Sequence, residues 1–200
     1  MKNPKEADFS LKKVKLIPGG GLQVVYKVST DIDGSTYEKE EVTKDTRMPH
    51  PDLTKPIDSL LTFLAKTLRF EESLTVVRSK DFAATPKQLK AAEKANKQLL
   101  DQMDVTGFAL SGKDDNLAVI VTGKLITELK TVVALNSPRI KFNNTTYGFE
   151  DVLEDKVDLI KSEVYKYLFD GKKSQLDMFN GTPESGEEKP SGKDAAAGDN

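Results

Sequence analysis

The chain has 200 residues, of which 37% are hydrophobic and 31% charged, and its formal net charge at pH 7 is −2. It contains no cysteine and one histidine, which excludes disulfides, thiolate catalysis, zinc–thiolate sites and histidine-rich metal clusters. No apolar run approaches the roughly 20 residues that a membrane-spanning helix needs, and the first residues are charged. We therefore expect a cytoplasmic protein with no membrane contact, cofactor or metal.

Three strands are predicted in the first part of the chain. The segment 9–17 is strand-like and is followed by a turn of one proline and three glycines. Apolar and polar residues then alternate over 22–29, with the period of two that is typical of a strand. Asp33 and Gly34 predict a second hairpin turn, and a polar, exposed strand is expected over 37–43.

Two helices are expected next. After a connection with prolines at 49, 51 and 56, apolar residues recur at helical spacing over 57–68. Thr85, Pro86 and Gln88 then combine an N-cap, a first-turn proline and a capping-box glutamine, which predict the start of the second helix. We expect this helix to bury one apolar face, made of Leu89, Ala92, Ala95 and Leu99.

The rest of the folded part repeats the order of the first. Strands are predicted near 104–111, 117–126 and 130–142, and a long amphipathic helix over 149–168 that ends before Gly171. The order strand-strand-strand-helix thus occurs twice, in halves 1–80 and 81–170 that share no sequence identity. It predicts an α+β domain over 1–170, a mainly antiparallel sheet with helices packed on one face.

The final segment, 181–200, has no large apolar side chain and is predicted to be a disordered acidic tail. It contains five acids and two bases, so residues 1–180 carry a charge of about +1. A nearly neutral body has no strong global attraction to nucleic acid. Any affinity for DNA must therefore come from a local basic face.

A pentapeptide before this tail reads Gln175-Leu176-Asp177-Met178-Phe179. It resembles the Gln-Leu-x-Leu/Met-Phe peptide with which bacterial polymerases and repair proteins dock on the DNA sliding clamp. The resemblance covers these five residues and implies that Gln175 hydrogen-bonds at the rim of a pocket while the Leu, Met and Phe fill a hydrophobic cleft. Because the motif lies between the last helix and the tail, residues 171–180 are predicted to present it as an extended docking peptide.

Basic side chains are predicted to gather on one face of the N-terminal strands, and the candidates are Lys13, Lys15, Lys27 and Lys39. Tyr26 and Tyr37 lie near them and could stack on bases, which is how single strands are held without sequence preference. A second basic stripe on the capped helix is made of Lys90, Lys94 and Lys97. Acids in the same strands favour the alternative of a solvated charged surface.

These features together predict a non-enzymatic accessory protein of DNA replication, recombination or repair. The most concrete version is a phage-type single-stranded-DNA-binding protein recruited to the bacterial sliding clamp, since short, cysteine-free, Lys- and Glu-rich chains with polar tails resemble phage early proteins. Two other classes stay open. One is a clamp-binding regulator or inhibitor that does not contact DNA, and the other is a phage structural or assembly protein in which Leu176 and Phe179 pack onto the core.

Overall fold

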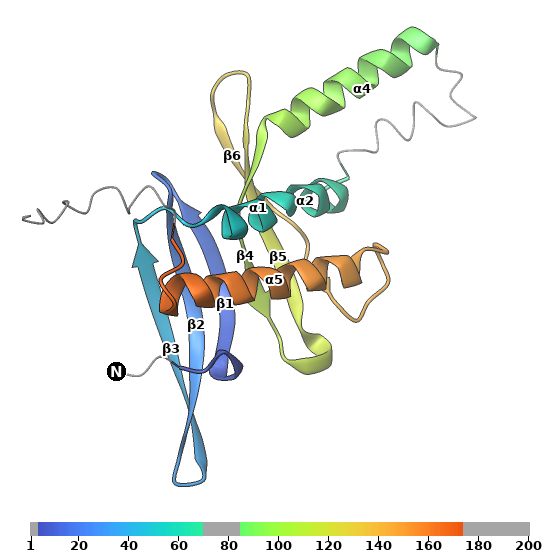
Figure 1. Cartoon of the computed structure of the whole chain (residues 1–200). Coiled ribbons are helices and arrows are strands. Elements are labelled where there is room, and N and C mark those ends of the chain that lie inside the picture. The colour runs from blue at the N-terminus through green and yellow to red at the C-terminus, as the bar shows by residue number, and fades with distance from the viewer. Residues whose placement is uncertain (1–3, 70–84, 174–200) are drawn as a thin grey trace, which may run out of the picture.

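Seven antiparallel strands form one sheet in the computed structural model, which describes residues 4–69 and 85–173 (Figure 1). The strands are β1 (Phe9–Ile17), β2 (Gly21–Ile32), β3 (Ser35–Asp45), β4 (Met103–Ser111), β5 (Ala118–Ile126), β6 (Val132–Asn136) and β7 (Ile140–Lys141). Together with the helices on this sheet, they confirm the predicted α+β class. The predicted third strand of the second half is divided into β6 and β7 by Ser137, Pro138 and Arg139, because the proline has no N–H to donate.

The strand order is β3-β2-β1-β4-β5-β6, and β7 also pairs with β5. Each half of the chain therefore supplies a three-stranded meander, and the meanders meet where β1 pairs with β4. That junction is short, since only Lys13, Val14 and Lys15 pair with Ala109, Phe108 and Gly107. The two halves share one sheet through these three register pairs.

Helices α1 (Pro51–Ser59), α2 (Leu61–Thr67) and α5 (Glu150–Phe169) lie on one side of the sheet (Figure 1). Helix α1 begins earlier than the sequence predicts, because His50 caps it by accepting a hydrogen bond from the Asp52 N–H and Pro51 occupies the first turn, where its missing N–H costs nothing. Helix α5 ends before Gly171, as predicted. Two single-turn helices, η1 (Glu6–Asp8) and η2 (Asp114–Asn116), complete the described elements.

Helix α4 (Pro86–Asp101) extends away from the sheet (Figure 1). Its predicted start is confirmed, because Thr85 and Gln88 form a complete capping box. The predicted burial of its apolar face is wrong: Ala95 is exposed, and Leu89 and Leu99 are only half-buried. Helical periodicity shows which face is apolar, but it does not show whether another element covers that face.

The core fills the space between the sheet and α1, α2 and α5. Both meanders contribute to it, for example with Val14 and Val24 from the first half and Phe108 and Val121 from the second. One edge of the core is aromatic, where the ring of Phe9 contacts the rings of Tyr26, Tyr165 and Phe169.

Two predicted segments lie outside the described residues. They are the docking peptide Gln175–Phe179 and the tail 181–200. Among the described helices, none is both long and apolar enough to cross a membrane.

Candidate nucleic-acid interface

Helices α1, α2 and α5 all lie on one side of the sheet and leave its other side uncovered by them (Figure 1). We call this side the open face. Its centre is built by β1, where a bulge between Leu11 and Lys13 changes the direction of alternation. Because of the bulge, Leu11 and Val14 both reach the core, while Lys13 and Lys15 are exposed on the open face.

One row of side chains crosses the whole open face. The register places Lys15 between Gln23 of β2 and Gly107 of β4, and the row continues outwards to Lys44 on β3 and to Thr122 and Asn136 on β5 and β6. Its side chains are cationic or hydrogen-bonding, and none is acidic. We call it the lysine row.

The neighbouring row is apolar apart from its central lysine. Lys13 lies between Val25 of β2 and Ala109 of β4, and beyond these are Val42 on β3 and Ile120 on β5. Val42 is 63% exposed. Within the described ranges, neither Lys13 nor Lys15 forms an ion pair. Both ammonium groups are therefore available to an anionic partner.

Three more lysines gather at one end of the open face, around Glu38. Lys27 donates a hydrogen bond of 2.7 Å to the Glu38 carboxylate. This bond is the main reason that the pKa of Glu38 is lowered, and the charges of Lys113 and Lys12 act in the same direction. Because Glu40 also lies opposite Lys27, acids and lysines are mixed at this end, and the acid-free part of the open face is the lysine row.

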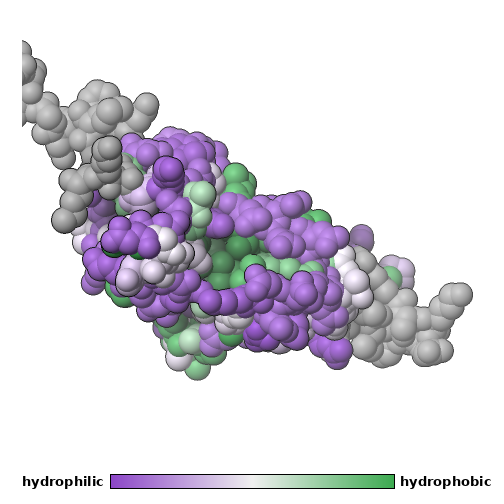
Figure 2. Space-filling view, turned by 90° about the horizontal axis from the view of Figure 1, so that it is seen from below, coloured by the Kyte–Doolittle hydropathy of each residue, from purple (hydrophilic) through white to green (hydrophobic). Residues whose placement is uncertain are grey.

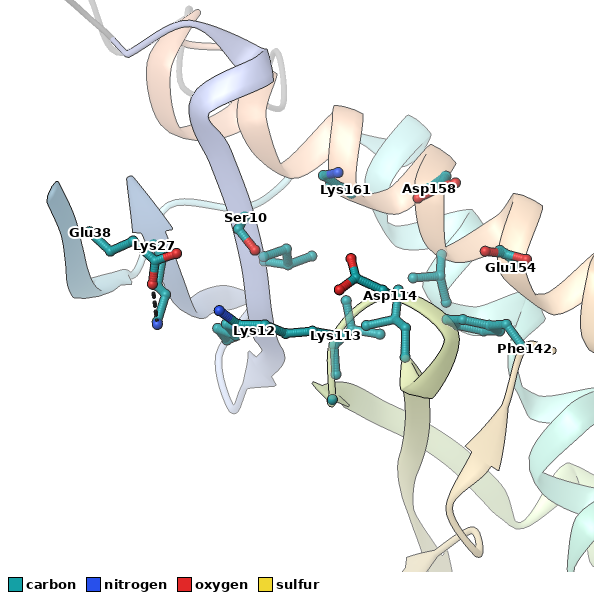
Figure 3. A pocket seen from close by; sticks show the side chains of 15 residues that line it. Ser10, Lys12, Lys27, Glu38, Lys113, Asp114, Phe142, Glu154, Asp158 and Lys161 are labelled. Atoms are coloured by element: carbon teal, nitrogen blue, oxygen red, sulfur yellow. Dashed lines mark hydrogen bonds and ion pairs between the residues drawn. The ribbon is translucent and has the colours of Figure 1, made fainter. Parts of the chain in front are cut away.

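A cleft of about 330 Å³ opens beside these lysines, where β1 and β4 separate beyond their short junction (Figure 3). Leu11, Leu110 and Phe142 are among its apolar lining residues, and hydrophobic residues are visible in a hollow between hydrophilic surfaces at this end of the molecule (Figure 2). Glu154 and Asp158 of α5 line the wall opposite Lys12. Lys161 of α5 and Asp114 of η2 also line the cleft, so both of its walls carry charges of both signs.

The structure brings together three of the four lysines predicted on the strands. Lys13, Lys15 and Lys27 share the open face, but the prediction for Lys39 is wrong, because it pairs in register with Val28, whose side chain packs against the core. The two-residue turn could have shown this, since pairing Ile32 with Ser35 places Glu40, not Lys39, opposite Lys27.

The two tyrosines do not lie on the open face. Tyr26 is only 4% exposed, and its hydroxyl donates a hydrogen bond to Glu41, so its ring cannot stack on a base. Tyr37 is 57% exposed, but it pairs with Thr30 on the side of the sheet that Tyr26 faces. Among the described residues, the rows that cross the open face contain no aromatic ring.

The second predicted stripe, Lys90, Lys94 and Lys97, is exposed on α4 as expected. Because α4 extends away from the sheet, this stripe is separate from the lysine row (Figure 1). Sequence reasoning missed Lys12, Lys44 and Lys113. The register of the β2–β3 hairpin could have shown Lys44, whereas Lys12 depends on the bulge and Lys113 on the tertiary approach of the β4–β5 turn to β1.

No group of three or more acidic or histidine side chains that could hold a metal ion occurs in the described part of the chain. Comparison of the chain with protein-family models, with curated proteins and with solved structures found no match.

Proposed function

We propose that this protein is a non-enzymatic accessory factor of DNA metabolism that binds single-stranded DNA on its open face and is recruited to the bacterial sliding clamp through Gln175–Phe179. The observation that carries the DNA part is the lysine row, an acid-free line of side chains from Lys44 to Asn136, with Lys13 in the adjacent row. The clamp part rests on the resemblance of the pentapeptide.

The shape of the sheet favours a single strand over a duplex. The major groove admits a helix or a two-stranded ribbon, and a sheet six strands wide cannot enter it. The β2–β3 hairpin does extend beyond the sheet (Figure 1), but the side chains near its tip include Asp31, Asp33 and Glu38, which repel phosphates. A flexible strand can instead lie across the open face, with its phosphates beside the lysines.

The mode of binding follows from the absence of aromatic rings in these rows. Stacking on an aromatic ring contributes about 1–3 kcal/mol per base in proteins that hold single strands, and the described open face does not supply it. Lysine–phosphate contacts alone give sequence-independent dissociation constants of about 10⁻⁴–10⁻⁶ M. A docking peptide that concentrates the protein at the clamp turns two weak contacts into one stronger attachment.

The DNA part is tested by fluorescence anisotropy with a labelled single-stranded oligonucleotide over a range of salt concentrations. The test variant is Lys13→Gln/Lys15→Gln, and the matched control is Lys55→Gln/Lys156→Gln, which removes two charges from α1 and α5 on the opposite side. We expect the test variant to bind several-fold more weakly and to lower the slope of log K against log salt by about 1 per lysine. Equal affinities of test and control variants would refute the open face as the DNA site.

The clamp part is tested separately, by binding of the full chain to a purified bacterial sliding clamp. The triple variant Gln175→Ala/Leu176→Ala/Phe179→Ala is expected to lose clamp binding and to keep the affinity for the oligonucleotide. Clamp binding without any oligonucleotide binding would instead identify a clamp regulator that does not contact DNA.

A further inference from the structure

The two edges of the sheet differ in how they are protected. Strand β3 is long and carries the charged run Glu38, Lys39, Glu40 and Glu41, the kind of edge that discourages pairing with another strand. Strand β6 is the opposite edge and reads Val-Val-Ala-Leu-Asn, without a charge or a proline. In the described part of the chain, no strand pairs with its outer side.

The backbone of β6 presents a regular set of groups to this outer side. The N–H of Ser137 donates to Val121, and the carbonyl of Thr131 accepts from Thr127, so the odd-numbered residues at both ends of β6 turn their polar groups towards the rest of the hairpin. Hydrogen-bonding direction alternates along an antiparallel strand. The N–H and C=O groups of Val132, Ala134 and Asn136 therefore point outwards.

The side chains on and beside β6 are apolar and accessible. Val132 is 62% exposed and Val133 is 41% exposed. The adjoining hairpin adds Leu129, which is 89% exposed, and Ile126, which is 38% exposed. An uncharged edge strand flanked by exposed apolar residues is a site for strand addition.

We infer that β6 pairs with β6 of a second copy of this chain, antiparallel and about a two-fold axis at Ala134. In this register Ala134 meets its own symmetry mate and Val132 meets Asn136, which uses every outward-pointing backbone group of the strand. Val133 lies opposite Leu135 on the helix side, so apolar residues meet on that face. No like charges meet, because β6 has none.

A second copy fits this edge better than an unrelated peptide because the strand is complementary to itself about its central residue. The two-fold axis is perpendicular to the sheet, so the pairing joins the two sheets edge to edge with both open faces on the same side. Two lysine rows then lie on one continuous surface. The dimer rests on β6 alone and stands even if the proposed DNA binding is refuted.

Analytical ultracentrifugation of the full chain over micromolar to millimolar concentrations tests the inference. We expect the mass to rise from 22.1 kDa to twice that value as the concentration increases. Ala134→Lys and Ala134→Glu should each stay monomeric, since like charges then face each other at the axis. An equimolar mixture of the two variants should dimerise again, because the charges become opposite.

The control is Val42→Lys, which places the same charge on the other edge strand and should leave the dimer intact. Melting curves of the dilute variants establish that they are folded, and Ala134 tolerates both changes because its side chain is exposed and its polar backbone groups point outwards. A parent chain that is monomeric throughout, dimers of either single variant, or a mixture that stays monomeric would each overturn the pairing. Oligonucleotide binding measured on the parent chain at concentrations where it is monomeric separates this result from the proposed function.

Discussion

Replacing Gly107 with alanine tests the junction on which the single sheet depends. Gly107 has a φ of +150° and pairs with Lys15 at one end of the β1–β4 junction. A Cβ atom added there would lie 2.0 Å from the Val14 carbonyl oxygen and 2.9 Å from the Lys15 Cα. Both contacts are with backbone, so no side-chain rotation can relieve them and β1 must move away from β4.

The expected cost has two parts. An unfavourable backbone conformation costs about 1–3 kcal/mol, and displacement of well-packed neighbours costs about 1–3 kcal/mol more. The free energy of unfolding should therefore fall by about 2–6 kcal/mol. For a chain of this size each kcal/mol lowers the melting temperature by about 2–4 °C, so the loss should be about 4–24 °C.

The measurement is urea and thermal unfolding followed by circular dichroism, with Gly34→Ala as the control. Gly34 also has a positive φ, +77°, but no atom lies within 4 Å of the Cβ position in its hairpin turn. The control should therefore lose only the conformational part, about 1–2 kcal/mol. If Gly107→Ala were no less stable than Gly34→Ala, the close approach of β1 and β4 at this residue would be refuted.

Three further predictions concern a helix cap, an acid and a tyrosine. Thr85→Ala should weaken the start of α4 by about 1 kcal/mol without lowering the melting temperature, because the first turn of α4 is exposed and only Leu99 and Leu100 near its end pack against the core. The expected result is faster amide exchange confined to the first turn, and a large drop in melting temperature would contradict the exposure of that turn. Hydrogen bonds from Arg47 hold the pKa of Asp45 well below its usual range. Because the folded pKa of Asp45 lies below the unfolded one, its stabilising contribution is complete above about pH 4 and is lost as the pH falls through the folded pKa. The free energy of unfolding should therefore fall less steeply at acid pH in Asp45→Asn than in the parent, and identical acid dependences would count against the Asp45–Arg47 ion pair. Tyr26→Phe removes one part-buried hydrogen bond and should lower the free energy of unfolding by about 1 kcal/mol. It should leave the affinity for the oligonucleotide unchanged, and a loss of affinity would contradict the burial of this ring.

Local signals in the sequence were sufficient for most of the elements. Alternation predicted the second strand, the other strands of both meanders were predicted close to their observed positions, and the Thr85–Gln88 capping box predicted the start of α4 to the residue. Proline was more ambiguous. The prolines near 51 indicated a connection, whereas Pro51 begins α1 because a first-turn residue needs no hydrogen-bonded N–H.

The candidate interface depended on features that local patterns describe poorly. Strict alternation from Phe9 and Leu11 would turn Lys13 and Lys15 towards the core, and only the extra residue at the bulge turns them outwards. In the sequence, the bulge corresponds to a change in the spacing of the apolar residues, which is two from Phe9 to Leu11 and three from Leu11 to Val14. The burial of Tyr26 depends on helix α5, more than 100 residues away in the chain, whose Phe169 contacts its ring.

The short β1–β4 junction also has a consequence for how the chain folds. Within each meander, strands are joined by short turns, so their contacts are local and form quickly. Val14 and Phe108, which pair at the junction, are separated by more than ninety residues. Closing so long a loop carries a large entropic cost, which is offset only by the three register pairs and by contacts in the shared core. The docking of two preformed meanders is therefore expected to be the late, rate-limiting step of folding, and substitutions at the junction should slow folding more than equally destabilising substitutions within either hairpin.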